Sequence, residues 1–268
     1  MTQERERYTM GYGQASTAIM GLRTAQSHAG FFLPHLKPGI KLLDVGCGPG
    51  TITAGFAELV APGEVIGTEI EATQVALAEQ NAAARNVSNV TFKVGSLYHL
   101  PFESETFDAV FLSAILGNLQ EPVKGLQEAH RVLKSGGVIG IKEFDHGGDI
   151  VYPMFPGLEK FNDCYLRLRR GNGHDPDGGR KIGSYLLEAD FRDLKLSATY
   201  ENLSGPDQLD GAVQLNLGLL KEGWADQFIS QGWATADTIV EMTEAWLTFA
   251  RTPGAILAMT WCEAIAWK

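Results

Sequence analysis

Three glycines stand within five residues, directly after an apolar run and an acidic residue, in the stretch LLDVGCGPGTIT. Gly46, Gly48 and Gly50 follow Asp44 there, and a bare glycine backbone lets a ligand approach closely. A helix that begins at Thr51 would present free N–H groups and a positive dipole to a carboxylate or a phosphate. The stretch therefore predicts a binding loop between a strand and a helix.

The glycine spacing differs from the dinucleotide-binding fingerprint. That fingerprint, G-x-G-x-x-G, would place its third glycine at the position of Thr51. Nineteen residues after Gly50, Glu69 ends the next apolar segment. A carboxylate there can accept hydrogen bonds from both hydroxyls of a ribose, and it repels a 2′-phosphate. Together the loop and the acid predict a ligand that contains a ribose, with Ile70 against its base.

The loop needs a sheet to hold it, and the surrounding sequence alternates β-branched runs with helical patterns. After the first strand, further strands are expected at 63–70, 90–94, 107–113 and 137–144. Helices are expected at 51–59, 72–85 and 123–133, the last ending in KSGG, a basic turn followed by glycine. This alternation predicts a parallel sheet with helices on both faces.

The second half of the chain follows a different pattern. Residues 147–178 are rich in glycine and aspartate and predict an irregular excursion, whereas 181–189 predict a helix and 194–202 a strand. Residues 207–251 carry helical spacing, and 256–268 can form a closing strand. All five tryptophans follow position 220. We therefore expect a helical cap over the carboxyl edge of the sheet, where such folds bind ligands.

Composition and charge exclude several classes of protein. A chain of 268 residues with 44% hydrophobic residues is not disordered, and its net charge of −10 disfavours nucleic acid and anionic membranes as partners. No signal peptide and no membrane span are recognisable, so a cytoplasmic protein is expected. The three cysteines Cys47, Cys164 and Cys262 suit neither a disulfide framework nor a metal site, and we expect three reduced thiols and no metal.

The successive motifs resemble those of class I S-adenosylmethionine-dependent methyltransferases, in particular the ubiquinone/menaquinone-biosynthesis-like, or type 11, small-molecule enzymes. The resemblance covers residues 39–144 and rests on four segments in fixed order: LLDVGCGPGTIT, VIGTEI, VGSLYHLPFESETFDAVFLSAILGNL and EAHRVLKSGGVIGIKEF. It implies a Rossmann-like, doubly wound α/β fold. The sheet would have seven mostly parallel strands with the last one antiparallel, and a helical cap would be added.

The same resemblance suggests how the chain is divided. The divisions are an N-terminal lid and helix at 1–38, a cofactor-binding core at 39–146, cap insertions at 147–178 and 205–253, and closing helix and strands at 179–204 and 254–268.

Residue by residue, the resemblance implies a site for S-adenosylmethionine and its product S-adenosylhomocysteine. Loop amides would face the carboxylate of the methionine moiety, Glu69 would bind the ribose, and Ile70 would pack on the adenine. Ser96 stands where the family usually has an acid that accepts from the adenine amino group. The implied cofactor-binding residues are Tyr8, Asp44, Gly46, Cys47, Gly48, Gly50, Glu69, Ile70, Gln74, Ser96, Leu97 and Ser113.

The expected reaction is transfer of a methyl group to an O, N, S or C atom of a small molecule by in-line displacement. An acceptor that carries a proton also needs a base. Asp145 and His146, just beyond the fifth strand, are the best-placed candidates, although both also suit a turn. Substrate-binding candidates are Tyr12, Asn118, Glu143, Tyr152 and Trp246. The basic stretch RLRRGNGHDPDGGRK could meet an anionic substrate, but its aspartates favour a solvated loop.

Two other functions are compatible with the sequence. An NAD-dependent oxidoreductase could use the same sheet, although Thr51 and the motif order disfavour it. A protein of methyltransferase fold could also bind the cofactor without methylating, as a cyclase or a regulatory module. No residue in the sequence excludes this second possibility.

Overall fold

The structure is a computed structural model that describes residues 8–268. Within this range a single sheet of eight strands has the order β3–β2–β1–β4–β5–β8, with β7 on the free edge of β8 and β6 beside its first residues. The strands are β1 (Lys41–Val45), β2 (Glu64–Glu69), β3 (Val90–Val94), β4 (Phe107–Ser113), β5 (Leu133–Phe144), β6 (Ile150–Tyr152), β7 (Arg192–Asn202) and β8 (Ile256–Trp267).

Strands β1 to β5 pair in parallel, and β8 runs antiparallel to both β5 and β7. The expected Rossmann-like fold, a mostly parallel sheet whose last strand is antiparallel, is therefore confirmed. The three-residue strand β6 is an addition to the seven strands expected, and it pairs with Ile256–Ala258 at the start of β8.

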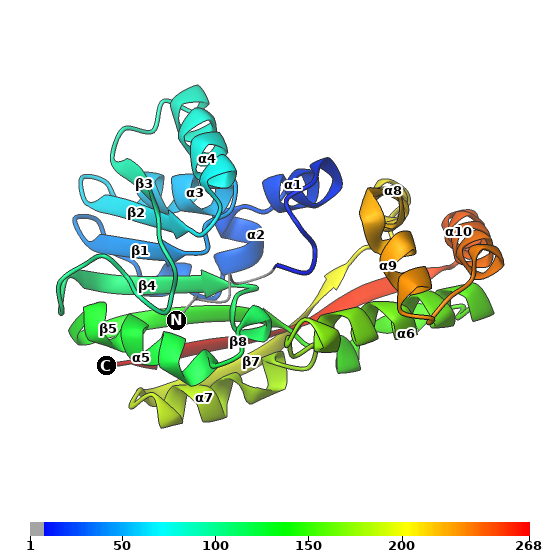
Figure 1. Cartoon of the computed structure of the whole chain (residues 1–268). Coiled ribbons are helices and arrows are strands. Elements are labelled where there is room, and N and C mark those ends of the chain that lie inside the picture. Colours follow the sequence, from blue (N-terminus) through cyan, green and yellow to red (C-terminus); the bar gives the residue numbers. More distant parts are fainter. Residues whose placement is uncertain (1–7) are drawn as a thin grey trace.

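Two layers of helices cover the sheet (Figure 1). One face carries α2 (Ala25–Ala29) and α3 (Thr51–Val60). Phe32, which follows α2, and Phe56 of α3 both pack on Phe111 of β4. The other face carries α5 (Pro122–Val132) and α7 (Ile182–Glu188). Helix α4 (Ala72–Ala84) packs on β2 and β3. The central strands are thus buried on both faces, which is why they read as nearly continuous apolar runs.

Two expectations about the chain were wrong. Helix α5 ends at Val132 rather than in KSGG, because Leu133 already pairs with Phe107 as the first residue of β5. The region expected to be irregular contains a regular helix, α6 (Pro156–Gly171). Leu158, Phe161 and Leu168 form its buried stripe, a helical spacing that the flanking glycine-rich segments obscured.

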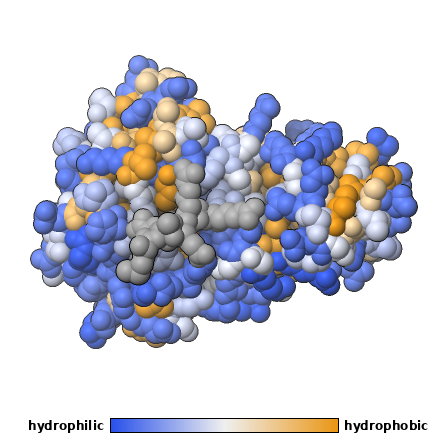
Figure 2. Space-filling view, viewed as in Figure 1, coloured by the Kyte–Doolittle hydropathy of each residue, from blue (hydrophilic) through white to orange (hydrophobic). Residues whose placement is uncertain are grey.

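The cap is a second apolar core beyond the carboxyl edge of the sheet. Strands β7 and β8 extend past the sheet and reach α6, α8 (Pro206–Leu219), α9 (Ala225–Ser230) and α10 (Ala236–Ala250) (Figure 1). Trp224, Trp233 and Trp246 belong to this core, whereas the other two tryptophans lie on β8. Figure 2 shows apolar side chains on the outer surface of the helical end, where Ile229 and Val240 are exposed.

Helix α1 (Gln14–Gly21) connects the two parts of the molecule. It packs against α8 of the cap, and Gln74 of α4 donates from its amide nitrogen to Thr17 of α1 at 3.2 Å. The N-terminal segment therefore spans the gap between sheet and cap.

Candidate cofactor and acceptor site

The glycine loop between β1 and α3 is held by backbone geometry. Gly46 has a φ of +69°, its N–H donates to the Thr68 carbonyl at 2.7 Å, and a Cβ there would collide with Ile115. Gly50 also has a positive φ, but a Cβ there would lie 2.7 Å from Ala78 of α4. Gly50 therefore serves helix packing and does not line the pocket, which differs from its expected role.

Glu69 ends β2 with its carboxylate buried beside the loop. Its Oε2 accepts from the Gly48 N–H at 3.1 Å, and its Oε1 accepts from the Ile70 N–H at 2.7 Å and the Tyr12 hydroxyl at 3.4 Å. Burial raises the pKa of Glu69, while the backbone donors oppose that shift. The carboxylate is therefore fixed at the loop, where the sequence predicts a ribose.

Asp44 lies at the carboxyl end of β1 and is almost fully buried. The Thr53 hydroxyl of α3 donates to its Oδ2 at 2.6 Å. Burial is the main cause that raises the pKa of Asp44 to about 7, and the negative charge of Glu69 adds to it. Asp44 thus titrates near neutral pH on the wall of the pocket.

Most of the expected cofactor residues meet around this one pocket. Nine line it: Tyr8, Asp44, Gly46, Cys47, Gly48, Glu69, Ile70, Leu97 and Ser113. Besides Gly50, two do not. Gln74 bridges to α1, and Ser96 accepts from the Tyr98 N–H at 3.1 Å on the turn after β3.

The N-terminal segment covers the same pocket. Tyr8 and Tyr12 lie with ring centroids 5.4 Å apart, and Met20 and Arg23 add to the wall. Tyr12, one of the substrate-binding candidates, lines this pocket as well, and its hydroxyl donates to Glu69 at 3.4 Å. Met20 and Arg23 were missed because no local motif marks residues that only the tertiary fold brings to the loop.

A second and larger cavity, of about 720 Å³, lies between the cap and the sheet. Its walls are mainly apolar and come from α1, α6, α8 and the extended parts of β7 and β8. The two cavities share Tyr8, Met20, Arg23 and Asn118 as wall residues. A ligand on the glycine loop and a ligand under the cap would therefore meet at these four residues.

Only some of the predicted substrate-binding residues line one of the two cavities. Trp246 and Asn118 line the large cavity. Glu143 is 1% exposed and lies behind Gly117, and burial raises its pKa. Tyr152 is 65% exposed and lines neither cavity, so the structure does not bring it to the site.

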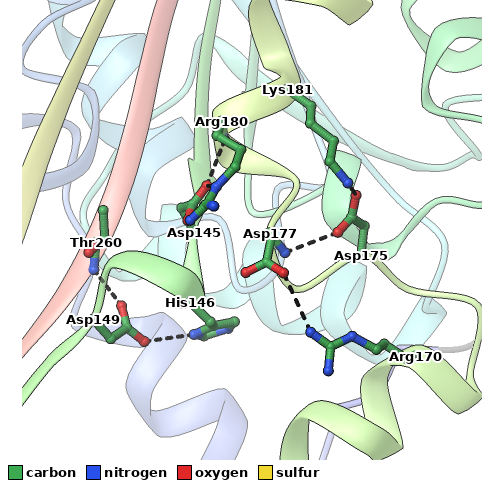
Figure 3. A network of polar contacts seen from close by, with 9 residues as sticks. All are labelled: Asp145, His146, Asp149, Arg170, Asp175, Asp177, Arg180, Lys181 and Thr260. Carbon is green, nitrogen blue, oxygen red and sulfur yellow. Dashed lines mark hydrogen bonds and ion pairs between the residues drawn. The ribbon is translucent and has the colours of Figure 1, made fainter.

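Asp145 and His146 are adjacent in sequence but face different partners (Figure 3). The Asp145 carboxylate accepts from the backbone N–H of Arg180 and forms an ion pair with its guanidinium, which lowers the pKa of Asp145. It lines neither cavity. His146 does line the large cavity, with Nδ1 2.9 Å from Asp149 and Nε2 3.2 Å from the Tyr165 hydroxyl.

The basic stretch from Arg167 to Lys181 begins in the last turns of α6, and most of its charges form ion pairs. Lys181 pairs with Asp175, and Arg170 pairs with Asp177 at 3.5 Å (Figure 3). Arg169 differs from them, since it is 2% exposed and donates to Asn118 at 3.1 Å. Arg167 and Arg180 pair with Asp163 and Asp145, which lie outside the stretch, so its basic side chains other than Arg169 are engaged in ion pairs.

Other site types were sought in the part of the chain that the structure describes. Between residues 8 and 268, no three His, Cys, Asp or Glu side chains are arranged to hold a metal ion. None of the helices in that range is long and apolar enough to cross a bilayer.

The pocket at the glycine loop fits a nucleoside that carries an amino-acid end. Glu69 supplies acceptors for ribose hydroxyls, and α3 begins beside the pocket at Thr51 without a side-chain cap, so the N–H groups of its first turn can face a carboxylate. The Ser113 hydroxyl is buried without a hydrogen-bond partner among the described residues, which leaves a polar group for a ligand. This donor and acceptor set suits S-adenosylmethionine.

Comparison with known proteins agrees with this geometry. A family model described as a methyltransferase domain matches residues 36–164. The ubiquinone/menaquinone biosynthesis C-methyltransferase UbiE of Vibrio vulnificus is 31% identical over 193 residues, which cover 68% of this chain and 72% of that protein. The chain belongs to the S-adenosylmethionine-dependent methyltransferase family.

A second relative of this methyltransferase is an uncharacterized methyltransferase of Schizosaccharomyces pombe, 36% identical over 175 residues. The alignment covers 63% of each chain, so the chain spans less than two thirds of that relative. Among solved structures, the YcgJ protein from Bacillus subtilis superposes with a TM-score of 0.59 at 19% identity, covering 89% of this chain and 97% of that one. That likeness shows that the two chains share a fold.

Proposed function

We propose that this methyltransferase transfers a methyl group from S-adenosylmethionine to a small, largely apolar molecule enclosed between the cap and the sheet. The observation that carries the proposal is the shared wall of Tyr8, Met20, Arg23 and Asn118, which joins the glycine-loop pocket to the large cavity. The acceptor class follows from the lining of that cavity, where Phe161, Trp224, Trp246 and Leu257 lie.

The residues of the chain have a limited task in such a reaction. The bound cofactor supplies a methyl group on a sulfonium, which is already a good electrophile. Glu69, Asp44 and the glycine loop hold the donor, while the cap positions the acceptor and excludes water. Positioning of this kind lowers a barrier by about 7–11 kcal/mol.

Two experiments test the proposal. Calorimetry with S-adenosylmethionine, S-adenosylhomocysteine and NAD should give binding of the first two ligands and none of the third. Preference for NAD would overturn the proposal in favour of an oxidoreductase. Incubation with methyl-labelled cofactor and a metabolite extract should then label an apolar small molecule, whereas tight cofactor binding without any transfer of label would favour a non-methylating role.

A further inference from the structure

We propose that Tyr165, His146 and Asp149 form a proton relay that takes the proton of a hydroxyl-bearing acceptor, such as a phenol, in the large cavity. This inference rests on the proposed methyl transfer and narrows its acceptor class. All three side chains line the cavity.

The hydrogen bonds of the relay run in one direction. Arg169 Nη1 lies 3.2 Å from the Tyr165 oxygen, and because a guanidinium only donates, that oxygen accepts from it. The Tyr165 hydrogen is free for His146 Nε2, 3.2 Å away, in the tautomer that the proposed relay requires. His146 then carries its own hydrogen on Nδ1 and donates it to Asp149 at 2.9 Å.

The far end of the relay is anchored in the sheet. The second carboxylate oxygen of Asp149 accepts from the Thr260 N–H of β8 at 2.7 Å (Figure 3). The Tyr165 ring stacks on Trp224 with centroids 5.2 Å apart, and the His146 ring stacks on Phe144 at 5.3 Å. Both rings are thus fixed by packing, as a preorganised site requires.

The near end of the relay is connected to the junction of the two cavities through Arg169. The same guanidinium that donates to Tyr165 donates through Nη2 to Asn118 at 3.1 Å, and Asn118 lines both cavities. Arg169 is 2% exposed, and its Nε has no hydrogen-bond partner among the described residues. Its buried charge favours negative charge that develops on an oxygen here and disfavours an ammonium acceptor.

The chemistry balances with the groups present. The Tyr165 oxygen accepts one hydrogen bond and donates one, which leaves a lone pair for the O–H of the acceptor. As the acceptor O–H bond breaks, its proton passes to the Tyr165 oxygen and the Tyr165 proton passes to His146 Nε2. The freed oxygen pair bonds to the methyl carbon, and the cofactor sulfur keeps the electron pair of the broken S–C bond. The proton ends on an imidazolium beside Asp149.

The test uses the full chain, methyl-labelled S-adenosylmethionine and three probes of one shape: naphthol, naphthylamine and naphthalenethiol. We expect label on naphthol. Tyr165→Phe should lower kcat by at least about a hundredfold with KM within about threefold, the loss typical of a missing general base. Tyr200→Phe, on the exposed β7 surface, is the matched control and should keep the wild-type rate.

The split between kcat and KM separates proton transfer from a structural role. His146→Gln should also lower kcat by about a hundredfold with KM within about threefold, because glutamine cannot take up the proton that Tyr165 passes on. Asp149→Asn provides a second variant if Tyr165→Phe does not fold.

Several results would overturn the relay. These are wild-type rates in Tyr165→Phe or His146→Gln, a loss that appears in KM rather than in kcat, or label on the amine or thiol but not on naphthol. If the protein binds the cofactor but transfers no label to naphthol, the inference that the acceptor carries a hydroxyl is wrong. The proposed methyl transfer is then still tested by the assay with the metabolite extract. Absence of cofactor binding would instead contradict the proposed function itself.

Discussion

The backbone N–H of Gly48 donates to the Oε2 atom of Glu69 at 3.1 Å, so the glycine loop after β1 and the end of β2 hold each other in place. The same carboxylate accepts from the hydroxyl of Tyr12 in the N-terminal segment. One side chain therefore links the loop, the second strand and the segment that covers the pocket.

Glu69→Gln should weaken cofactor binding. Two charge-assisted hydrogen bonds to ribose hydroxyls would become neutral, which lowers affinity by roughly 10- to 100-fold. Titration calorimetry with S-adenosylhomocysteine measures the change. Glu64→Gln, at the opposite and exposed end of the same strand, is the control and should bind normally. Equal affinities of Glu69→Gln and wild type would remove Glu69 from the cofactor site.

Asp44→Asn should change how stability depends on pH. The folded protein holds the Asp44 proton up to about pH 7, whereas the unfolded chain releases it near its ordinary pKa of 3.8. Because the folded-state pKa is raised, Asp44 lowers the free energy of unfolding as pH rises between these values, by up to about 4 kcal/mol.

Urea unfolding of wild type and Asp44→Asn from pH 4 to 8 measures this effect. An asparagine side chain still offers an oxygen to the Thr53 hydroxyl, but it has no ionisable group. The stability of the variant relative to wild type should therefore rise with pH up to about 7 and then stay level. A difference that stays constant across this range would show that Asp44 does not titrate there.

Gly211→Leu should block the large cavity. Gly211 lies on α8 and lines that cavity, and a Cβ built there meets nothing within 4 Å. A leucine can therefore enter the empty space without displacing the core. We expect a raised KM for the acceptor with unchanged calorimetric affinity for S-adenosylmethionine. Gly211→Ala adds only a methyl group and is the matched control, and a similar KM in both variants would place the acceptor elsewhere.

Asp145→Asn should destabilise the protein more than it slows transfer. Arg180 lowers the pKa of Asp145, so the carboxylate stabilises the folded state above its ordinary pKa and loses this effect as pH falls. The variant should lose about 1–3 kcal/mol of unfolding free energy at neutral pH, the cost of breaking a charged hydrogen bond. Urea unfolding measures the loss, and parallel kinetics should give a much smaller fall in kcat than His146→Gln.

The cofactor half of the site could be predicted from short stretches of sequence. Strand, glycine loop and helix follow one another within residues 41–60, and Glu69 ends the strand that pairs with β1. Such neighbours in sequence are neighbours in space, since parallel strands joined by short helices place their carboxyl ends at one edge. Gly50 is the exception, because its packing against Ala78 depends on how α4 docks.

The acceptor half depended on the tertiary structure. Sequence spacing placed Asp145 and His146 at the carboxyl edge of the sheet but could not say which of the two faces the cavity. That was decided by Arg180 on one side and by Tyr165 on the other, together with a contact between Asp149 and Thr260 that joins residues 111 positions apart. The sequence by itself determined the fold class and the donor site, because local strand–loop–helix patterns specify them. The tertiary structure alone decided which side chains line the large cavity, because these contacts arise only when distant segments pack together.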